Sequence, residues 1–277
     1  MQDKTSSPPG DRVTIDVSAR IAEVTLNRPD KLNALDPAMF EAVIAAGERL
    51  SRVAGLRAVI LTGAGRGFCA GLDKETFASI AAGGGSAPTS AELAKHTHGI
   101  ANDFQQAAYV WRTLPVPVIA AIHGVALGGG FQIALGADIR YVAPDGRLSI
   151  LEIKWGLVPD MAEIALMREL ARSDVIRELA MTGCIFSGAE ALAYGFATSL
   201  HADPLAAARA TAKEIAARSP DAVRAVKRLL NMASDADTAA ILVAESKEQA
   251  QLIGSPNQVE AVRAGIEGRP GRFADDG

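Results

Sequence analysis

The chain has 277 residues, of which 49% are hydrophobic and 22% charged, a balance typical of globular proteins and not of disordered segments. Its formal net charge is −4, so the composition argues against a nucleic-acid partner, although a few local basic residues can still bind phosphate. The chain has only two cysteines, which argues against a disulfide framework. It has no apolar N-terminal stretch that could serve as a secretory signal, and no apolar run of about 18 residues that would indicate a membrane partner. Together these features predict a cytoplasmic protein.

The N-terminal part of the sequence predicts a tail, two short strands and a helix. Residues 1–11 are polar and contain Pro and Gly, which predicts a loose tail. Apolar and polar residues alternate over Val13–Val17 and Ile21–Leu26, the pattern of two strands. Asp36 followed by Pro37 predicts the start of a helix, because Asp caps a helix well and Pro suits its first position.

The middle of the chain predicts apolar strands and one irregular segment. Ala58–Leu61, Val116–Ile122 and Ile139–Val142 are apolar runs of strand length, and Phe131–Ala137 has helical spacing. The segment 76–100 is interrupted by glycine, serine and proline. It predicts a plain surface loop, with a lid over a substrate as the alternative.

The last part of the chain predicts helices alone. A capping box that begins at Ser187 opens one helix, and the pairs Asp203-Pro204 and Ser219-Pro220 each open another. Strands interspersed with helices therefore give way to helices only. This order predicts three parts, namely a tail over 1–11, an α/β core over 12–202 and a C-terminal helical region over 203–277.

Two glycine-containing loops follow apolar strands and can hold an anion. They are Phe68-Cys69-Ala70-Gly71-Leu72-Asp73 and Leu127-Gly128-Gly129-Gly130. Glycine lets a backbone N–H approach a ligand, and two converging N–H groups form an oxyanion hole. Taken singly, each loop is better explained as a tight strand-to-helix turn. A dinucleotide-binding fingerprint is excluded, because the third glycine is misplaced and no acidic residue ends a following strand.

Three motifs together resemble the crotonase (enoyl-CoA hydratase/isomerase) superfamily. They are Asn27–Leu35, Phe68–Asp73 and His123–Gly130, in this order. The resemblance implies a spiral of strand-strand-helix units with a C-terminal helical region, and a homotrimer or a dimer of trimers. It also implies an acyl-CoA thioester as substrate, with no separate cofactor and no metal.

The resemblance assigns two kinds of binding residue. The backbone N–H groups of Leu72 and Gly129 would hold the thioester carbonyl. The residues that would bind the CoA portion of the substrate are Asp30, Lys31, Leu32, Ala70, Gly71, Asp73 and Gly128.

The acid–base positions of the family leave a choice between two reactions. Hydratases of the family resemble one another in two glutamates that hold a water, and the corresponding positions here are Gln132 and Glu152. An amide cannot accept a proton at neutral pH, although it can orient water. Asp160, eight residues after Glu152, resembles the second carboxylate of dienoyl-CoA isomerases, which shuttle protons across the acyl chain.

The surroundings of these carboxylates bear on the choice. Glu152 lies among apolar residues, and burial would raise its pKa toward the range in which protons move both ways. Asp160 is also explained as the N-cap of a helix over 161–170. The sequence therefore ranks double-bond isomerisation of an unsaturated acyl-CoA first, hydration of a trans-2-enoyl-CoA second, and a non-catalytic acyl-CoA-binding scaffold third.

Overall fold

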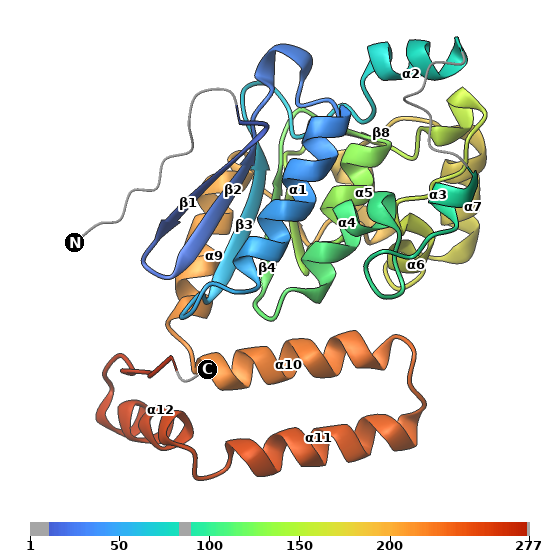
Figure 1. Ribbon diagram of the computed structural model, residues 1–277. Coiled ribbons are helices and arrows are strands. Elements are labelled where there is room, and N and C mark those ends of the chain that lie inside the picture. The colour runs from blue at the N-terminus through green and yellow to red at the C-terminus, as the bar shows by residue number, and fades with distance from the viewer. Residues whose placement is uncertain (1–10, 83–89, 276–277) are drawn as a thin grey trace.

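The computed structural model describes residues 11–82 and 90–275 (Figure 1). The tail predicted over 1–11 therefore lies outside the described residues, except for Asp11. In the described part, strands and helices are interspersed as far as Leu200, and only helices follow. This order confirms the predicted α/β fold with C-terminal helices. No helix in these described ranges has the length and apolar character that a membrane crossing requires.

A six-stranded sheet forms the centre of the molecule, in the order β1-β2-β3-β4-β6-β9. The strands are β1 Val13–Ser18, β2 Ile21–Leu26, β3 Ala58–Gly63, β4 Val118–Ile122, β6 Ile139–Val142 and β9 Ser199–Leu200. β1 and β2 are antiparallel, and the other neighbours are parallel, with Val24 of β2 opposite Leu61 of β3. The predicted strands are confirmed. β4 begins after Pro117 and not at Val116, because proline has no N–H to donate to the sheet.

A second, three-stranded sheet in the order β5-β7-β8 was not predicted. Its strands are β5 Val125–Leu127, β7 Arg147–Ser149 and β8 Phe186–Ser187. β5 pairs in parallel with β7, which pairs antiparallel with β8. Because β5 ends at the second glycine loop, this small sheet fixes the position of that loop.

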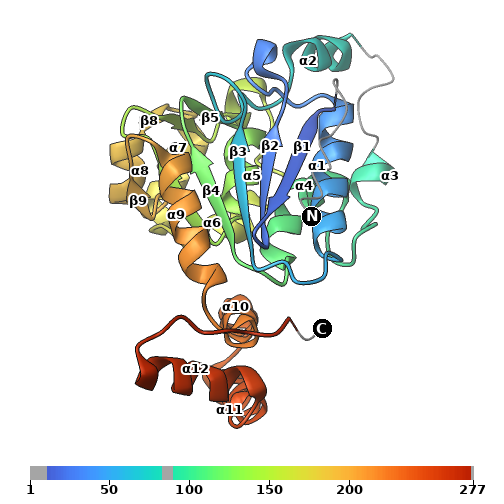
Figure 2. The same cartoon turned by 90° about the vertical axis from the view of Figure 1, so that its left-hand side faces the viewer.

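Helices cover both faces of the large sheet (Figures 1 and 2). One face is covered by α1 Pro37–Leu50, α4 Asp103–Thr113 and α5 Gly129–Leu135, and the other by α9 Pro204–Ala216. Trp111 and Phe131 are fully buried in the core on the first face. On the second face, Ala208 and Ala212 of α9 pack against Ile60 of β3. Such small side chains let α9 lie close to the sheet.

The remaining helices are shorter or lie outside the core. They are η1 Pro29–Lys31, α2 Lys74–Ala81, α3 Ser90–Leu93, η2 Glu152–Trp155, α6 Glu163–Met167, α7 Ser173–Thr182, α8 Gly188–Tyr194, α10 Pro220–Ala233, α11 Thr238–Leu252 and α12 Pro256–Glu267. Figure 1 shows α10 and α11 running side by side below the core, with α12 beside them. The helices after residue 203 thus fall into two groups, because α9 packs on the sheet and α10–α12 extend beyond it. The predicted domain boundary at 203 stays a prediction.

Most of the predicted helix starts are confirmed by their caps. Asp36 and Asp203 each accept a hydrogen bond from a backbone N–H in the first turn, and Ser187 forms the predicted capping box with Glu190. Ser219 occupies the N-cap position of α10 without a side-chain bond. The segment 76–100 is more helical than predicted, since it contains most of α2 and all of α3. Its most glycine-rich part, 83–89, lies outside the described residues.

Candidate active site

The two glycine loops lie directly against each other. The Cys69 N–H donates to the Val125 carbonyl over 2.9 Å, and the Leu127 N–H donates to the Cys69 carbonyl over 3.0 Å. A Cβ atom on Gly71 would lie 2.5 Å from the Leu127 oxygen and 3.6 Å from the Gly129 nitrogen. Gly71 also has a φ of +81°, so this close approach of the loops depends on glycine.

The backbone N–H groups of Leu72 and Gly129 have no hydrogen-bond acceptor among the residues that the structure describes. Leu35 accepts from the Asp73 N–H at 2.9 Å and donates to the Gly71 carbonyl at 2.8 Å, so the Leu72 N–H between them faces away from Leu35. Gly129 is the first residue of α5, and N–H groups of a first turn have no acceptor within their own helix. Two such neighbouring donors can hold an oxygen that gains negative charge.

Glu152 places a carboxylate beside these donors. It begins η2, which two residues separate from the end of β7, and the carbonyl of Ser149, the last residue of β7, accepts a hydrogen bond from the Gly128 N–H at 2.9 Å. A Cβ atom on Gly128 would lie 2.9 Å from Glu152 Oε1, so the carboxylate packs against the second glycine loop. Glu152 is only 9% exposed. Burial raises the pKa of Glu152, and the charge of Asp160 adds to this, while the hydrogen bond from Gln132 opposes it.

Gln132 of α5 holds one oxygen of Glu152. Its Nε2 donates to Glu152 Oε1 at 2.6 Å, and its Oε1 accepts from the Met161 N–H at 2.7 Å. Both polar atoms of the amide therefore contact the protein. The second oxygen, Glu152 Oε2, is buried and has no hydrogen-bond partner in the described part of the chain. This oxygen is the one that remains able to accept a proton.

Asp160 lies in the loop between η2 and α6. The alternative explanation of Asp160 as a helix N-cap is wrong, because α6 begins at Glu163 and its N-cap residue is Ala162. The helix starts later than predicted because Ala162 adopts a left-handed backbone conformation, with a φ of +63°. As a residue Asp160 is exposed, but the protein packed around its carboxyl raises its pKa. Its charge also raises the pKa of Glu152, so the two carboxyls interact electrostatically.

Glu163 is a third carboxyl in this region, and the sequence did not predict it. The residue is 0% exposed, and neither carboxyl oxygen has a hydrogen-bond partner among the described residues. Burial raises the pKa of Glu163 well above its ordinary value, with further contributions from Glu152 and Asp160. The available signal was a carboxyl among apolar neighbours such as Met161 and Ile164.

The loop predicted to bind CoA lies next to the first glycine loop. The Leu32 carbonyl accepts a hydrogen bond from the Ala70 N–H at 2.9 Å, which joins the two segments. Asp30 and Lys31 are exposed beside this junction in η1. Asn33 is fully buried, and its amide donates to backbone carbonyls of the loop after β3. The structure thus brings the predicted CoA residues together on one edge of the site.

Asp73 differs from these residues because its carboxylate is occupied. It is buried, forms an ion pair with Arg28 and accepts a hydrogen bond from the Glu75 N–H at 2.9 Å. Burial alone would raise the pKa of Asp73, but the bonds from Glu75 and Arg28 lower it. The Asp73 side chain therefore ties the predicted CoA loop to the first glycine loop, and any contact of Asp73 with CoA would involve its backbone.

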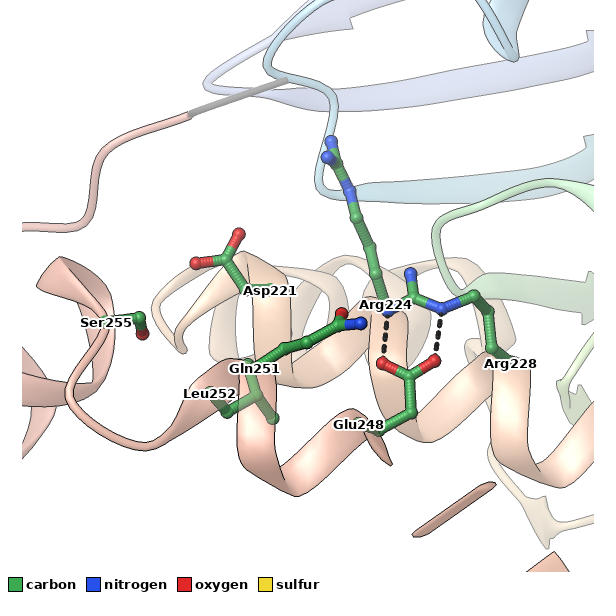
Figure 3. A pocket seen from close by; sticks show the side chains of 7 residues that line it. All are labelled: Asp221, Arg224, Arg228, Glu248, Gln251, Leu252 and Ser255. Carbon is green, nitrogen blue, oxygen red and sulfur yellow. Dashed lines mark hydrogen bonds and ion pairs between the residues drawn. The ribbon is translucent and has the colours of Figure 1, made fainter. Parts of the chain in front are cut away.

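A surface hollow lies between α10 and α11, away from these residues (Figure 3). It is lined by Asp221, Arg224, Arg228, Glu248, Gln251, Leu252 and Ser255. Arg228 pairs with Glu248 through hydrogen bonds of 2.8 Å and 2.7 Å, and Asp221 accepts from Asn257 at 2.8 Å. These charged groups are matched within the C-terminal helices, and no predicted site residue lines the hollow. Within the described ranges, no three His, Cys, Asp or Glu side chains are placed to hold a metal ion.

Comparison with known proteins gives consistent matches over most of the chain. A family model described as enoyl-CoA hydratase/isomerase matches residues 16–276. The chain is 31% identical over 256 residues to human mitochondrial Delta(3,5)-Delta(2,4)-dienoyl-CoA isomerase, covering 90% of this chain and 77% of that protein. It is 30% identical over 227 residues to (E)-benzylidenesuccinyl-CoA hydratase of Thauera aromatica, covering 80% and 83%. The crystal structure of enoyl-CoA hydratase from Bacillus anthracis matches with a TM-score of 0.85 and 26% identity, covering 96% of this chain and 100% of that chain.

Proposed function

The chain belongs to the enoyl-CoA hydratase/isomerase family, the crotonase superfamily that its motifs predict, and on this basis we propose that it moves a double bond of an unsaturated acyl-CoA. Members of this family are enzymes, so the chain is an enzyme of the hydratase/isomerase type. In the proposed reaction, the N–H groups of Leu72 and Gly129 hold the thioester oxygen, and Glu152 takes and returns protons.

The observation that carries this proposal is the position of Gln132. Its amide donates to Glu152 and accepts from the Met161 N–H, so both of its polar atoms are engaged by the protein. The water-holding pair of glutamates that the family resemblance implies for hydration is therefore reduced to one titratable group. A single buried carboxylate beside two backbone donors supports proton transfer to and from carbon without the addition of water.

The proposed reaction moves protons between the substrate and the protein and leaves the composition of the substrate unchanged. Ionised Glu152 removes a proton from the carbon next to the thioester carbonyl, and negative charge moves onto the carbonyl oxygen. The N–H groups of Leu72 and Gly129 stabilise this charge. A proton then returns to a carbon further along the unsaturated chain, either from Glu152 or from Asp160 in its protonated form, and the double bond shifts. In the second case Glu152 releases its proton to solvent and Asp160 takes one up before the next turnover. The electrostatic interaction between Glu152 and Asp160, and the similarity to dienoyl-CoA isomerases, support Asp160 as the second proton carrier.

Hydration is the second candidate. The similarity to (E)-benzylidenesuccinyl-CoA hydratase favours it, and the Gln132 Nε2 carries a second hydrogen that can orient water. The third interpretation of the sequence, a non-catalytic scaffold that only binds acyl-CoA, is disfavoured because members of the family are enzymes.

A panel of enoyl-CoA and dienoyl-CoA substrates, followed by chromatography with mass detection, separates the three candidates. Isomerisation changes retention without changing mass, hydration adds one water, and a scaffold changes neither. The Glu152→Gln variant should lose about 100- to 10,000-fold in rate, the usual contribution of a general acid–base group. Rapid hydration without isomerisation would refute the ranking.

Binding of the CoA portion can be tested without turnover. Free CoA should raise the melting temperature because a ligand of the folded state stabilises it, whereas NAD should not. A shift with NAD and none with CoA would contradict the proposed ligand class. We further propose a cytoplasmic location, no cofactor besides the CoA of the substrate, and assembly as a homotrimer or a dimer of trimers.

A further inference from the structure

Glu163 is a carboxyl that the reaction proposed above does not use. It is fully buried, and both of its oxygens are without hydrogen-bond partners among the residues described. A buried polar group in this state destabilises a fold, and buried polar atoms in folded proteins are generally hydrogen-bonded. The position of Glu163 therefore calls for a reason other than packing.

The segment that carries Glu163 also holds the reacting carboxylate. Ala162, with a φ of +63°, turns the chain directly before Glu163. On the other side of this turn, the Met161 N–H donates to Gln132, which in turn donates to Glu152. α6 packs on α5, the helix of Gln132. One short stretch of chain thus fixes both the amide that holds Glu152 and the buried carboxyl of Glu163.

The charged groups that act on Glu163 are all acidic. Glu152 acts from η2 and Asp160 from the loop before α6, and both raise the pKa of Glu163. The helix packed against it, α5, offers only the uncharged amide of Gln132. Carboxyls that interact in a buried site do not all ionise together, because each charge opposes the next. The most deeply buried of the three, Glu163, is the one that keeps its proton.

We propose, on the basis of the proposed function, that Glu163 is a positioning residue. It stays uncharged while Glu152 ionises, and loss of the Glu163 proton stops the reaction. An uncharged Glu163 adds no repulsion to the enolate that forms at the Leu72 and Gly129 N–H groups. An ionised Glu163 would add a negative charge two residues from Met161. Met161 lies against Gly129 and donates to the amide that holds Glu152. The reaction would then fail at alkaline pH for a reason that lies in Glu163.

The test is the pH dependence of kcat/KM for the unmodified enzyme, Glu163→Gln and a control. Glutamine keeps the size of Glu163 and cannot ionise. The acid limb should coincide in all proteins, whereas the alkaline limb of Glu163→Gln should move up by about one pH unit or more. The control is Glu178→Gln, which removes an exposed carboxyl on α7 and should leave both limbs unchanged. An unchanged alkaline limb in Glu163→Gln would overturn the proposal.

Infrared spectroscopy gives a second readout that needs no turnover. The unmodified protein at neutral pH should show a band of a protonated carboxyl, which is absent in Glu163→Gln and titrates away where activity falls. If Glu163→Gln does not fold, the titration of the unmodified protein still decides the matter, because absence of the band refutes the proposal. A protein that shows the band but converts no acyl-CoA would refute the proposed function alone.

Discussion

At the scale of single residues, the proposed chemistry depends on the groups that face the Glu152 carboxylate. One oxygen accepts a hydrogen bond from Gln132, and the other is buried without a partner in the described chain. The amide fixes the carboxylate without competing for its proton, since an amide does not titrate. Glu152 is therefore the only titratable group of the Gln132–Glu152 pair. The side chain at residue 132 is then expected to decide between isomerisation and hydration.

Replacing Gln132 with glutamate should therefore change the reaction. Two carboxylates within hydrogen-bond distance share a proton, and together they can hold and activate a water. In Gln132→Glu we expect hydratase activity, measured by product mass, to rise from a low baseline, and isomerase activity, measured by chromatographic retention, to fall. Gln249→Glu, which adds the same charge at an exposed position of α11, should change neither activity. Fast hydration by the unmodified protein with no gain in Gln132→Glu would mean that Gln132 already positions the water.

Glu163 predicts a particular dependence of stability on pH. Its pKa is raised in the folded protein, so the folded state holds the proton more tightly than the unfolded chain does. The resulting contribution to the free energy of unfolding is complete below about pH 4.3, the ordinary pKa of glutamate, and is lost as the pH rises toward the folded-state pKa. Glu163→Gln lacks this loss. Its melting temperature should therefore gain on that of the unmodified protein as the pH rises above about 4.3, and parallel curves would contradict the assignment.

The residues of the site differ in how well sequence could predict them. Gln132, Glu152 and Asp160 could be proposed from sequence because they stand at fixed distances from a recognisable motif. Glu163 was not found, because its burial arises from the packing of α6 on α5, which spacing along the chain does not reveal. Asp73 looks like a binding residue in sequence, and only the tertiary structure shows its carboxylate paired with Arg28.

At the scale of elements, the site depends on strands too short to predict. β5 and β7 contain three residues each, which is less than a period-two pattern needs to stand out. Yet the pairing of β5 with β7 brings Glu152 next to the second glycine loop. The longer strands of the large sheet were predicted from their apolar runs. The long strands form the central sheet, while the pairing of β5 with β7 sets the distance between Glu152 and the second glycine loop.

The contact between the two glycine loops can be tested by adding one methyl group. In Gly71→Ala the new Cβ would lie 2.5 Å from the Leu127 oxygen, so the loops must separate and the Leu72 and Gly129 N–H groups must move apart. Loss of one oxyanion donor typically costs about 100- to 1,000-fold in rate, and we expect a fall in kcat of this size. Gly254→Ala is the matched control, because Gly254 has a φ of +77° but no atom within 4 Å of the new Cβ. Near-normal turnover in a folded Gly71→Ala protein would rule out the carbonyl site.

At the scale of the whole molecule, the C-terminal region contacts the core in two places, through α9 and through the chain after α12. α9 is part of the core, since its alanines pack on the sheet. The chain after α12 returns to that core, where Asp275 pairs with Arg57 at 2.8 Å and with Arg20 at 3.0 Å. The sequence predicted helices in this region but not which of them would cover the sheet, because α9 and α10 begin with similar capping signals and differ in what they pack against.

The helices beyond α9 present apolar side chains to solvent. Exposed examples on α10, α11 and α12 are Val226, Leu230, Leu242, Val243, Val259, Val262 and Ile266. On α12, Val259, Val262 and Ile266 follow helical spacing and share one face, and Ile266 is 82% exposed. A contiguous apolar face of this kind marks a surface for association. These side chains support the proposed homotrimer or dimer of trimers.

A charge placed on this face should weaken the assembly. In Ile266→Glu, association would bury a carboxylate without a partner, so we expect a smaller particle in sedimentation velocity or light scattering than the unmodified protein gives. Ala261→Glu adds the same charge on the opposite face of α12 and should leave the particle size unchanged. Both variants should keep the melting transition of the core, because neither residue packs against the sheet. A monomeric mass for the unmodified protein, or equal particle sizes for Ile266→Glu and Ala261→Glu, would show that copies of the chain do not associate through this face.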